Sequence, residues 1–161
     1  MAAKVHKFNP CNPGCTSGGH TNCCADCTFP DTVTLTITYS GVGVCCFPSG
    51  TSITLTFDSV DSSPGTCVWK GTKTCATTPV KTLTATLTMG DGTPGDGCTT
   101  DQMFLDLVCT QSGSSDSHTG EVSPDSFTCS PLSIPFSSFS FFDGTAACCT
   151  LHATLSATVT P

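Results

Sequence analysis

Fourteen cysteines in a chain of 161 residues constrain this fold more than any other feature of the sequence. Cysteines at this density are typical of disulfide-bonded proteins, and disulfides form and persist in oxidising compartments. The opening MAAKVHKFNP contains no apolar run of the length that a signal peptide needs. The sequence therefore predicts a chain that reaches oxidising conditions by another route, holds a metal, or keeps its thiols reduced.

The composition is poor in charge and rich in hydroxyl groups. Charged residues make up 11% of the chain and the formal net charge is −7, while arginine is absent. Phosphate binding depends on neutralisation by Lys and Arg, so this balance argues against nucleic acid as a partner. No stretch approaches the apolar length of a membrane helix, which excludes that class of membrane contact. Serine and threonine together account for about three residues in ten, and uncharged hydroxyl surfaces pack against protein at a low desolvation cost.

Apolar residues alternate with polar ones, mostly threonine, in most segments from Asp31 onward, which is the period of a half-buried strand. Val68 and Trp69 indicate a further short strand, and Pro131 and Pro135 make the strand around them an edge strand. The alternating apolar positions are Val33, Leu35, Ile37, Tyr39, Ile53, Leu55, Phe57, Leu83, Ala85, Leu87, Met89, Met103, Leu105, Leu107, Cys109, Leu132, Ile134, Phe136, Cys149, Leu151, Ala153, Leu155, Ala157 and Val159. The pattern predicts an all-β fold for residues 30–161, an antiparallel β-sandwich or jelly roll of about 7–8 strands.

Residues 1–29 form a separate Cys/Gly/Pro-rich arm with few large apolar side chains. Its prolines and glycines, among them Pro10, Pro13 and Gly18, argue against any regular element there. A segment of this kind cannot bury a core of its own. We expect an irregular arm that is a disordered tail, is crosslinked, or becomes ordered on a neighbouring subunit.

All of the cysteines are candidates for disulfides, but their pairing cannot be read from the sequence. Neighbouring residues of a strand point to opposite faces, so each adjacent pair is expected to serve two different partners. In the last strand Cys149 shares parity with Leu151 and is expected in the core, which turns Cys148 outward to a loop, to the arm or to another chain. The candidates are Cys11, Cys15, Cys23, Cys24, Cys27, Cys45, Cys46, Cys67, Cys75, Cys98, Cys109, Cys129, Cys148 and Cys149.

A structural zinc site in the arm is the alternative to disulfides for part of this set. Its ligands would come from Cys11, Cys15, His20, Cys23, Cys24 and Cys27. The Cys-x3-Cys and Cys-x2-Cys intervals fall within the range of zinc fingers, although the spacing between the halves is short. Apart from this zinc alternative, the sequence predicts no cofactor.

No motif predicts catalysis. Asp116, Ser117 and His118 contain the residue types of a hydrolase triad, but they are adjacent in a Gly/Ser-rich stretch without a nucleophile elbow. A triad needs groups brought together from separate elements. We therefore predict that the protein is not an enzyme.

Two parts of the chain resemble a loose group of cysteine-rich β-sandwich proteins from tailed phages and environmental bacteria. In the first part, Cys23-Cys24 is followed by Cys27, Pro30 and the strand from Val33 to Ile37. The second part comprises Leu107-Val108-Cys109, Cys129-Ser130-Pro131-Leu132, Phe136, Cys148-Cys149 and the stretch from Leu151 to Thr160. The resemblance covers most of residues 23–160. It implies a secreted or virion β domain and brings no catalytic residues with it.

Three features together predict a structural virion protein. They are a cysteine-rich composition without a signal peptide, neutral threonine faces, and the resemblance to phage and bacterial proteins. We expect a capsid-decoration (cement) or tail component, made in the cytoplasm and oxidised on release, whose partners are copies of itself or other virion proteins. The predicted location is the virion or the extracellular space. Two alternatives stay open: an extracellular filament or surface-layer subunit, and a carbohydrate- or host-binding module that uses the loops at one end of the sandwich.

Overall fold

The structure, a computed structural model, describes residues 20–22, 27–40, 45–59, 66–76, 80–90, 102–111, 117–119, 122–125, 128–129, 132–140, 148 and 154–161. Every regular element in these ranges is a strand, as the all-β prediction requires. The strands are β1 (His20–Asn22), β2 (Cys27–Phe29), β3 (Thr32–Ser40), β4 (Thr51–Phe57), β5 (Thr66–Cys75), β6 (Lys81–Gly90), β7 (Gln102–Gln111), β8 (Ser117–His118), β9 (Thr128–Cys129), β10 (Leu132–Phe139) and β11 (Thr154–Thr160). Within these ranges, no helix has the length and apolarity needed to cross a membrane.

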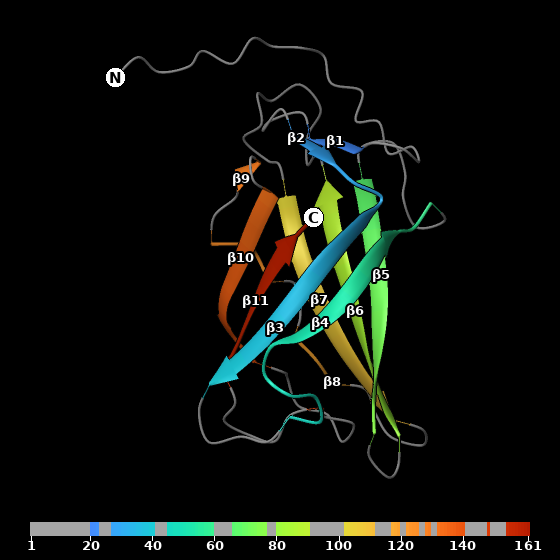
Figure 1. The fold of residues 1–161 in the computed structure, drawn as a ribbon, viewed down its shortest axis with the longest axis vertical. Coiled ribbons are helices and arrows are strands. Elements are labelled where there is room, and N and C mark those ends of the chain that lie inside the picture. The colour runs from blue at the N-terminus through green and yellow to red at the C-terminus, as the bar shows by residue number, and fades with distance from the viewer. Residues whose placement is uncertain are drawn as a thin grey trace.

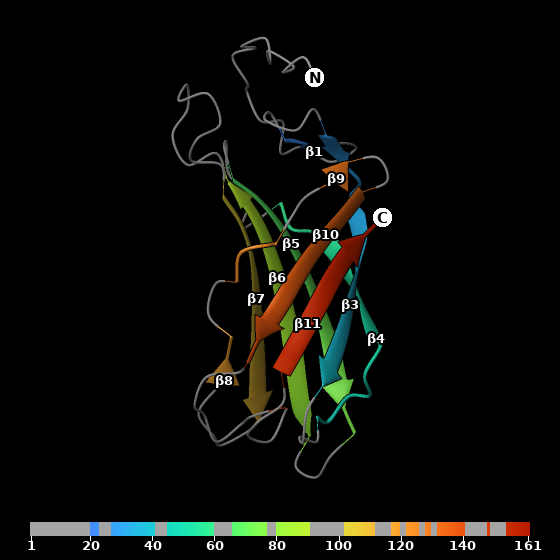
Figure 2. The same cartoon turned by 90° about the vertical axis from the view of Figure 1, so that its left-hand side faces the viewer.

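One continuous antiparallel sheet forms the body of the protein, in the order β8-β7-β6-β5-β4-β3-β11-β10-β9. Strands β3 to β7 form a meander, because each pairs with the next along the chain. The C-terminal hairpin β10–β11 then returns to the other edge of β3. The sheet folds over between β4 and β5, which share only the pairs Thr56↔Lys70 and Phe57↔Trp69. Two layers result, a front layer of β4, β3, β11 and β10 and a rear layer of β5, β6 and β7 (Figures 1 and 2).

The core lies between the two layers and follows the alternation in the sequence. Val33, Leu35 and Ile37 of β3 are fully buried, and Leu83, Ala85 and Leu87 of β6 face them from the rear layer without any exposure. The threonines between them stay half-buried or exposed on the outside. This arrangement confirms the prediction of an antiparallel all-β fold with one buried and one solvated face per layer.

The two layers approach closely where β5 passes behind β4. A Cβ atom added to Gly71 would collide with the carbonyl oxygen of Thr54 and lie 2.8 Å from Cδ2 of Leu55. Nearby, Trp69 is fully buried, and its ring meets that of Phe57 edge to face at 5.9 Å. The indole Nε1–H donates a hydrogen bond to the carbonyl oxygen of Pro30 at 3.0 Å. Trp69 is therefore a core residue that joins the layers.

Strand β5 is longer than the short strand that Val68 and Trp69 indicate, because it runs on to Cys75. Its second half, from Lys70 to Thr74, has no apolar side chain, so the hydrophobic pattern does not predict a strand there. The strand persists because β6 pairs with it along its whole length, down to the pair Cys75↔Lys81. Cross-strand hydrogen bonding thus extends β5 beyond the part that its side-chain pattern predicts.

Strand β10 changes its facing pattern part-way along. Leu132, Ile134 and Phe136 are buried at a spacing of two, and the next buried residue is Phe139. A register shift falls between Phe136 and Phe139, where Ser138 has a φ of 56°. This is a β-bulge, in which one extra residue re-aims the next side chain. On its outer side β10 pairs only with the short β9, at Leu132 and Ser133, as suits a strand that carries Pro135.

The arm is not irregular throughout, which corrects one expectation. His20–Asn22 and Cys27–Phe29 pair as a small antiparallel hairpin, with Thr21 opposite Thr28. The helix- and strand-breaking residues of the arm all precede His20, and the β-branched threonines of the paired segments favour a strand. The rest of residues 1–29 lies outside the described part of the chain.

Candidate functional site

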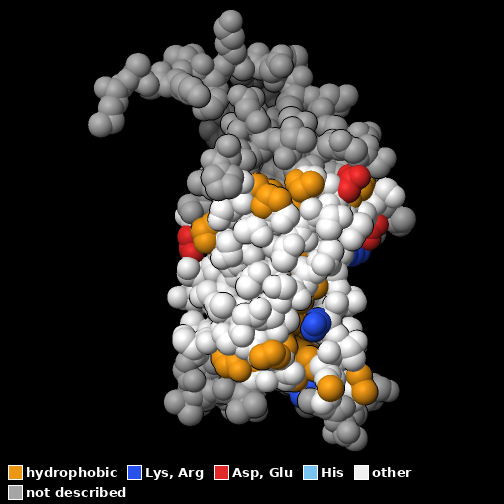
Figure 3. All heavy atoms as spheres, in the orientation of Figure 1, with side chains coloured by type: hydrophobic (Ala, Val, Ile, Leu, Met, Phe, Trp, Pro, Cys, Tyr) orange, Lys and Arg blue, Asp and Glu red, His pale blue; other side chains and the backbone are white. Residues whose placement is uncertain are grey.

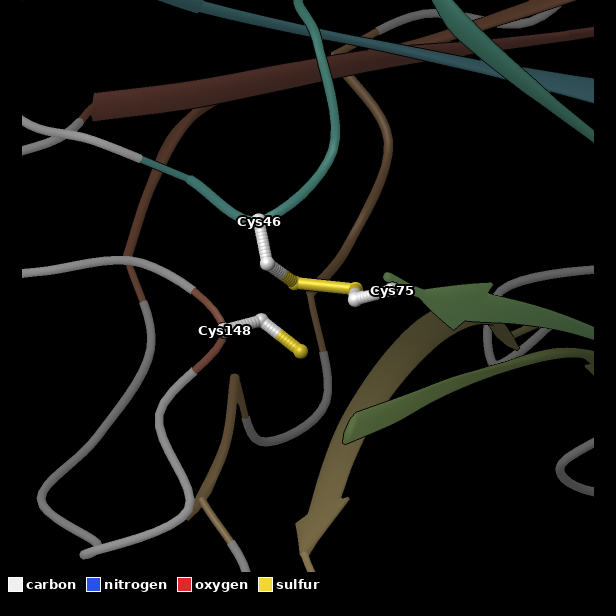
Figure 4. Close-up of side chains that lie close together, drawn as sticks. All are labelled: Cys46, Cys75 and Cys148. Atoms are coloured by element: carbon white, nitrogen blue, oxygen red, sulfur yellow. A yellow bond between two sulfur atoms is a disulfide. The ribbon is translucent and has the colours of Figure 1, made fainter. Parts of the chain in front are cut away.

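A cluster of cysteine sulfurs occupies one end of the molecule, the end at which β3, β5 and β7 finish. Cys46 comes from the connection between β3 and β4, Cys75 is the last residue of β5, and Cys148 precedes β11. Their Sγ atoms all lie within 4.8 Å of one another. Figure 4 shows the three side chains converging from separate segments. Four stretches that are distant in sequence therefore meet here once Cys109 of β7, the partner of Cys148, is included.

Two disulfides form this cluster, and both connect the front layer to the rear layer. Cys46 is bonded to Cys75 with a Cα–Cα distance of 5.5 Å, and Cys109 is bonded to Cys148 with a Cα–Cα distance of 5.7 Å. The bonds close sequence separations of 29 and 39 residues. By loop-closure entropy, each contributes about 3–4 kcal/mol to stability. The backbone N–H of Cys46 also donates to the carbonyl of Cys148 at 2.8 Å, which ties the two connections directly.

The position of Cys148 corrects the outward orientation expected from strand parity. Its side chain is 2% exposed and bonds to Cys109, which is fully buried in β7. The outward orientation was expected on the assumption that residues 148–160 form one strand, whereas β11 begins at Thr154. Because Cys148 lies outside β11, the alternation of that strand does not determine which way it points.

The remaining cysteines are only partly within the described chain. Cys45 and Cys67 are both buried and disulfide-bonded, and none of the cysteines whose side chains the structure describes is a free thiol. Since Cys46 is bonded to Cys75, the neighbours Cys45 and Cys46 have different partners. Cys27 and Cys129 are described only through their backbones, in β2 and β9. Cys11, Cys15, Cys23, Cys24, Cys98 and Cys149 lie outside the described residues.

The zinc alternative in the arm falls almost wholly outside the described residues. Of its candidate ligands, only the backbones of His20 and Cys27 are described, in β1 and β2. The sequence did not indicate Cys46, Cys75 and Cys148 as a metal-binding group. No spacing signal could have found it, because its members are separated by 29 or more residues.

The second feature of functional interest is the outer surface of the front layer, which we term the neutral face. It consists of the outward side chains of β4, β3, β11 and β10, and none of the residues in these four strands is charged. Its members are Ser52, Thr54, Thr56, Thr32, Thr34, Thr36, Thr38, Ser40, Thr154, Ser156, Thr158, Thr160, Ser133, Pro135, Ser137 and Ser138. In Figure 3 the surface over β3 and β11 is white, and the acidic and basic side chains lie to either side of it.

Strand register aligns these hydroxyl groups into rows across the neutral face. Thr34 lies between Thr54 and Thr160 in one row. Thr36 lies between Ser52 and Thr158 in the next, and the hydroxyls of Thr36 and Ser52 are 3.2 Å apart. Side chains of this kind satisfy one another or bind water, so the surface is polar without carrying charge.

The outer face of the rear layer, the charged face, shows the same threonine alternation along β6 but includes ionic groups on β5 and β7. Lys70, Thr86 and Asp106 form one row across β5, β6 and β7. Lys70 also pairs with Asp58, at 3.4 Å between Nζ and Oδ2. Asp106 accepts a hydrogen bond from the hydroxyl of Thr119 at 3.3 Å. The two outer faces therefore differ in charge although both include threonine-rich strands.

The Asp116-Ser117-His118 motif and Trp69 do not form a catalytic or sugar-binding site among the described residues. Ser117 and His118 form β8, which pairs with Val108 and Cys109 of β7, and Asp116 lies outside the described residues. Trp69, which could have stacked on a sugar, is fully buried and hydrogen-bonded.

No family model, curated protein or solved structure matches this chain. The resemblance to cysteine-rich phage and bacterial proteins consequently stays a prediction.

Proposed function

We propose that this protein is a structural, non-enzymatic subunit of a virion, a capsid-decoration or tail component that docks on other subunits through its neutral face. The observation that supports this role is the complete lack of charged residues in β3, β4, β10 and β11. Removing an ionised side chain from water costs far more than removing a hydroxyl that finds a hydrogen-bond partner. A face of threonine rows can therefore be buried against protein cheaply.

Lack of charge also removes repulsion between copies. The chain carries a formal net charge of −7, which would oppose close packing of identical subunits if it were spread evenly. The strands of the neutral face carry none of this charge, and the charged residues of the described strands are Lys70, Lys73, Lys81 and Asp106 of the rear layer. A subunit that presents its neutral face to its neighbours keeps those groups in solvent.

The disulfides serve the same role by holding the face in shape. Both interlayer bonds join connections of the front layer to strands of the rear layer. They restrain the front layer at the end where β3 finishes and β11 begins. A subunit stapled in this way suits a particle that must survive outside the cell, where disulfides persist.

A lysine placed on each face in turn tests the docking surface. Thr158→Lys changes the centre of the neutral face, and Thr84→Lys is the matched control at a half-buried, strand-central position of the charged face. We expect sedimentation velocity of the oxidised full chain to show concentration-dependent association, weakened by about tenfold or more in Thr158→Lys, as a buried unpaired charge requires. Thr84→Lys should associate like the wild type. Equal behaviour of the two variants would count against the neutral face as the docking surface.

The virion setting is tested by the genes that flank the coding sequence. Capsid, portal or tail genes on either side would support it, and a secretion operon would favour the filament or surface-layer subunit instead. The glycan-binding alternative predicts retention on a glycan array by a protein that stays monomeric at high concentration, which the docking proposal excludes.

A further inference from the structure

Three cysteines of the interlayer cluster form a group that could hold a metal, and the fourth, Cys109, is bonded to one of them. Three of the Sγ atoms lie within 4.8 Å of one another, and the fourth, that of Cys109, is bonded to the Sγ of Cys148. A tetrahedral zinc–thiolate centre has Zn–S bonds of about 2.3 Å, which place its sulfurs roughly 3.8 Å apart. Once both disulfides are reduced, three of the sulfurs already lie near this separation, and the Sγ of Cys109 would have to turn toward them from its place beside Cys148.

The surroundings of the cluster also suit a metal. Cys75, Cys109 and Cys148 are at most 2% exposed, while Cys46 is half-buried and gives an ion a way in from solvent. A closed, largely dry set of four ligands is typical of structural zinc sites. Reduction without a metal would leave three buried cysteines and the half-buried Cys46 with no bond between their sulfurs.

Two lysines flank the cluster on the face of the rear layer that carries Cys75 and Cys109. Lys81 lies directly opposite Cys75, and Lys73 lies in the same row as Cys109, with Leu83 between them. A zinc ion held by four thiolates has a net charge of −2, and nearby ammonium groups stabilise such a centre. The chain contains only 5 basic residues, so two of them in these rows is a notable concentration.

We propose that the reduced chain binds one zinc ion through Cys46, Cys75, Cys109 and Cys148, and that oxidation of this centre releases the ion and forms the two interlayer disulfides. In the conversion four Zn–S bonds break and two S–S bonds form. The four electrons pass to two molecules of a low-molecular-weight disulfide, which take up four protons and become four thiols. The same four residues thus join the front and rear layers in both redox states.

This centre would solve a pairing problem. A chain with fourteen cysteines has on the order of 10⁵ complete pairings. A zinc ion that gathers four particular thiols before oxidation would restrict their choice of partners to one another. A chain synthesised under reducing conditions would also have its layers held at this end before any disulfide forms.

Metal-protected alkylation of the full chain tests the site without any substitution. The reduced protein is loaded with Zn²⁺ under anaerobic conditions, treated with iodoacetamide, and mapped by peptide mass spectrometry. We expect Cys46, Cys75, Cys109 and Cys148 to be protected with zinc and alkylated after chelation. Protection of other cysteines in their place, or no protection at all, would overturn the proposal.

Substitutions give an independent reading and separate this site from the arm. Co²⁺ added to the reduced protein is expected to give the absorption of a tetrahedral thiolate complex. Cys46→Ser, at the half-buried ligand, should weaken Co²⁺ and Zn²⁺ binding by at least about 100-fold, because loss of an outer-shell partner alone costs 10–100-fold. The matched control Cys11→Ser/Cys15→Ser should leave the spectrum unchanged. Loss of the spectrum in the control and its retention in Cys46→Ser would place the metal in the arm and contradict the proposal.

Discussion

The two layers of this protein share the same pattern of buried side chains and differ in the charge of their outer surfaces. Both bury alternate apolar residues, so Leu35 in the front layer and Leu87 in the rear layer are equally inaccessible. Outward, the front layer shows only hydroxyl groups and a proline, whereas the rear layer carries Lys70 and Asp106 in one row. Core packing demands the inner pattern of both layers, but it does not explain why one outer face lacks charge. That difference is the feature from which we infer a docking role.

Loss of the indole at the layer junction should have the largest effect. Trp69→Ala removes a fully buried ring that contacts Phe57 and donates to Pro30, and we expect it to cost about 4 kcal/mol. Denaturant unfolding of the oxidised protein measures this loss. Trp69→Phe is the control, since it keeps most of the buried area and loses the hydrogen bond at a smaller cost. A loss below about 1 kcal/mol in Trp69→Ala would show that the two layers are stable without this junction.

Removal of one interlayer disulfide comes next. Cys46→Ser/Cys75→Ser should lower the free energy of unfolding by about 3–4 kcal/mol, since it frees a loop of 29 residues in the unfolded chain. Amide exchange should rise at the cystine end, in the connection of residues 45–50, and less around Trp69 at the other end. Uniform exchange across both ends would mean that the disulfides do not restrain the front layer locally.

A methyl group at the crossing point tests how tightly the layers approach. Gly71→Ala places a Cβ against the backbone of Thr54, which cannot rotate away, so we expect a loss of about 1–3 kcal/mol. Gly50→Ala is the comparison: its φ of 87° causes strain, but nothing lies within 4 Å of the added carbon. Thermal unfolding distinguishes the two. A greater loss at Gly50 than at Gly71 would contradict the close approach of β4 and β5.

Ionic strength should produce the smallest effect. Salt screens interactions between charges, and the neutral face offers none. Association of the oxidised chain is therefore expected to change by less than about twofold when salt rises from roughly 0.05 M to 0.5 M. Sedimentation velocity at both concentrations measures this change. Strong weakening by salt would assign docking to the charged face.

The core strands were predictable because strand parity is a local property. The alternation around Val33, Leu83 and Leu105 identifies β3, β6 and β7 and the side chains that each buries. The same reasoning failed at Cys148, which lies outside β11, and it did not find the bulge that turns Phe139 inward. It also shortened β5, whose second half is held by pairing with β6 rather than by its own pattern.

An all-β chain, its threonine-covered strands and its scarcity of charge were predictable, because they follow from residue type and from spacing over a few neighbours. Which cysteines meet was not predictable, since Cys46, Cys75, Cys109 and Cys148 are brought together by the path of the folded sheet. The gathering of the charge-free strands on one layer was not predictable either, because strand order depends on non-local pairing. The spacing of residues along a strand determines which face of the sheet a side chain lies on. The pairing of strands that are distant in sequence determines which side chains lie next to it.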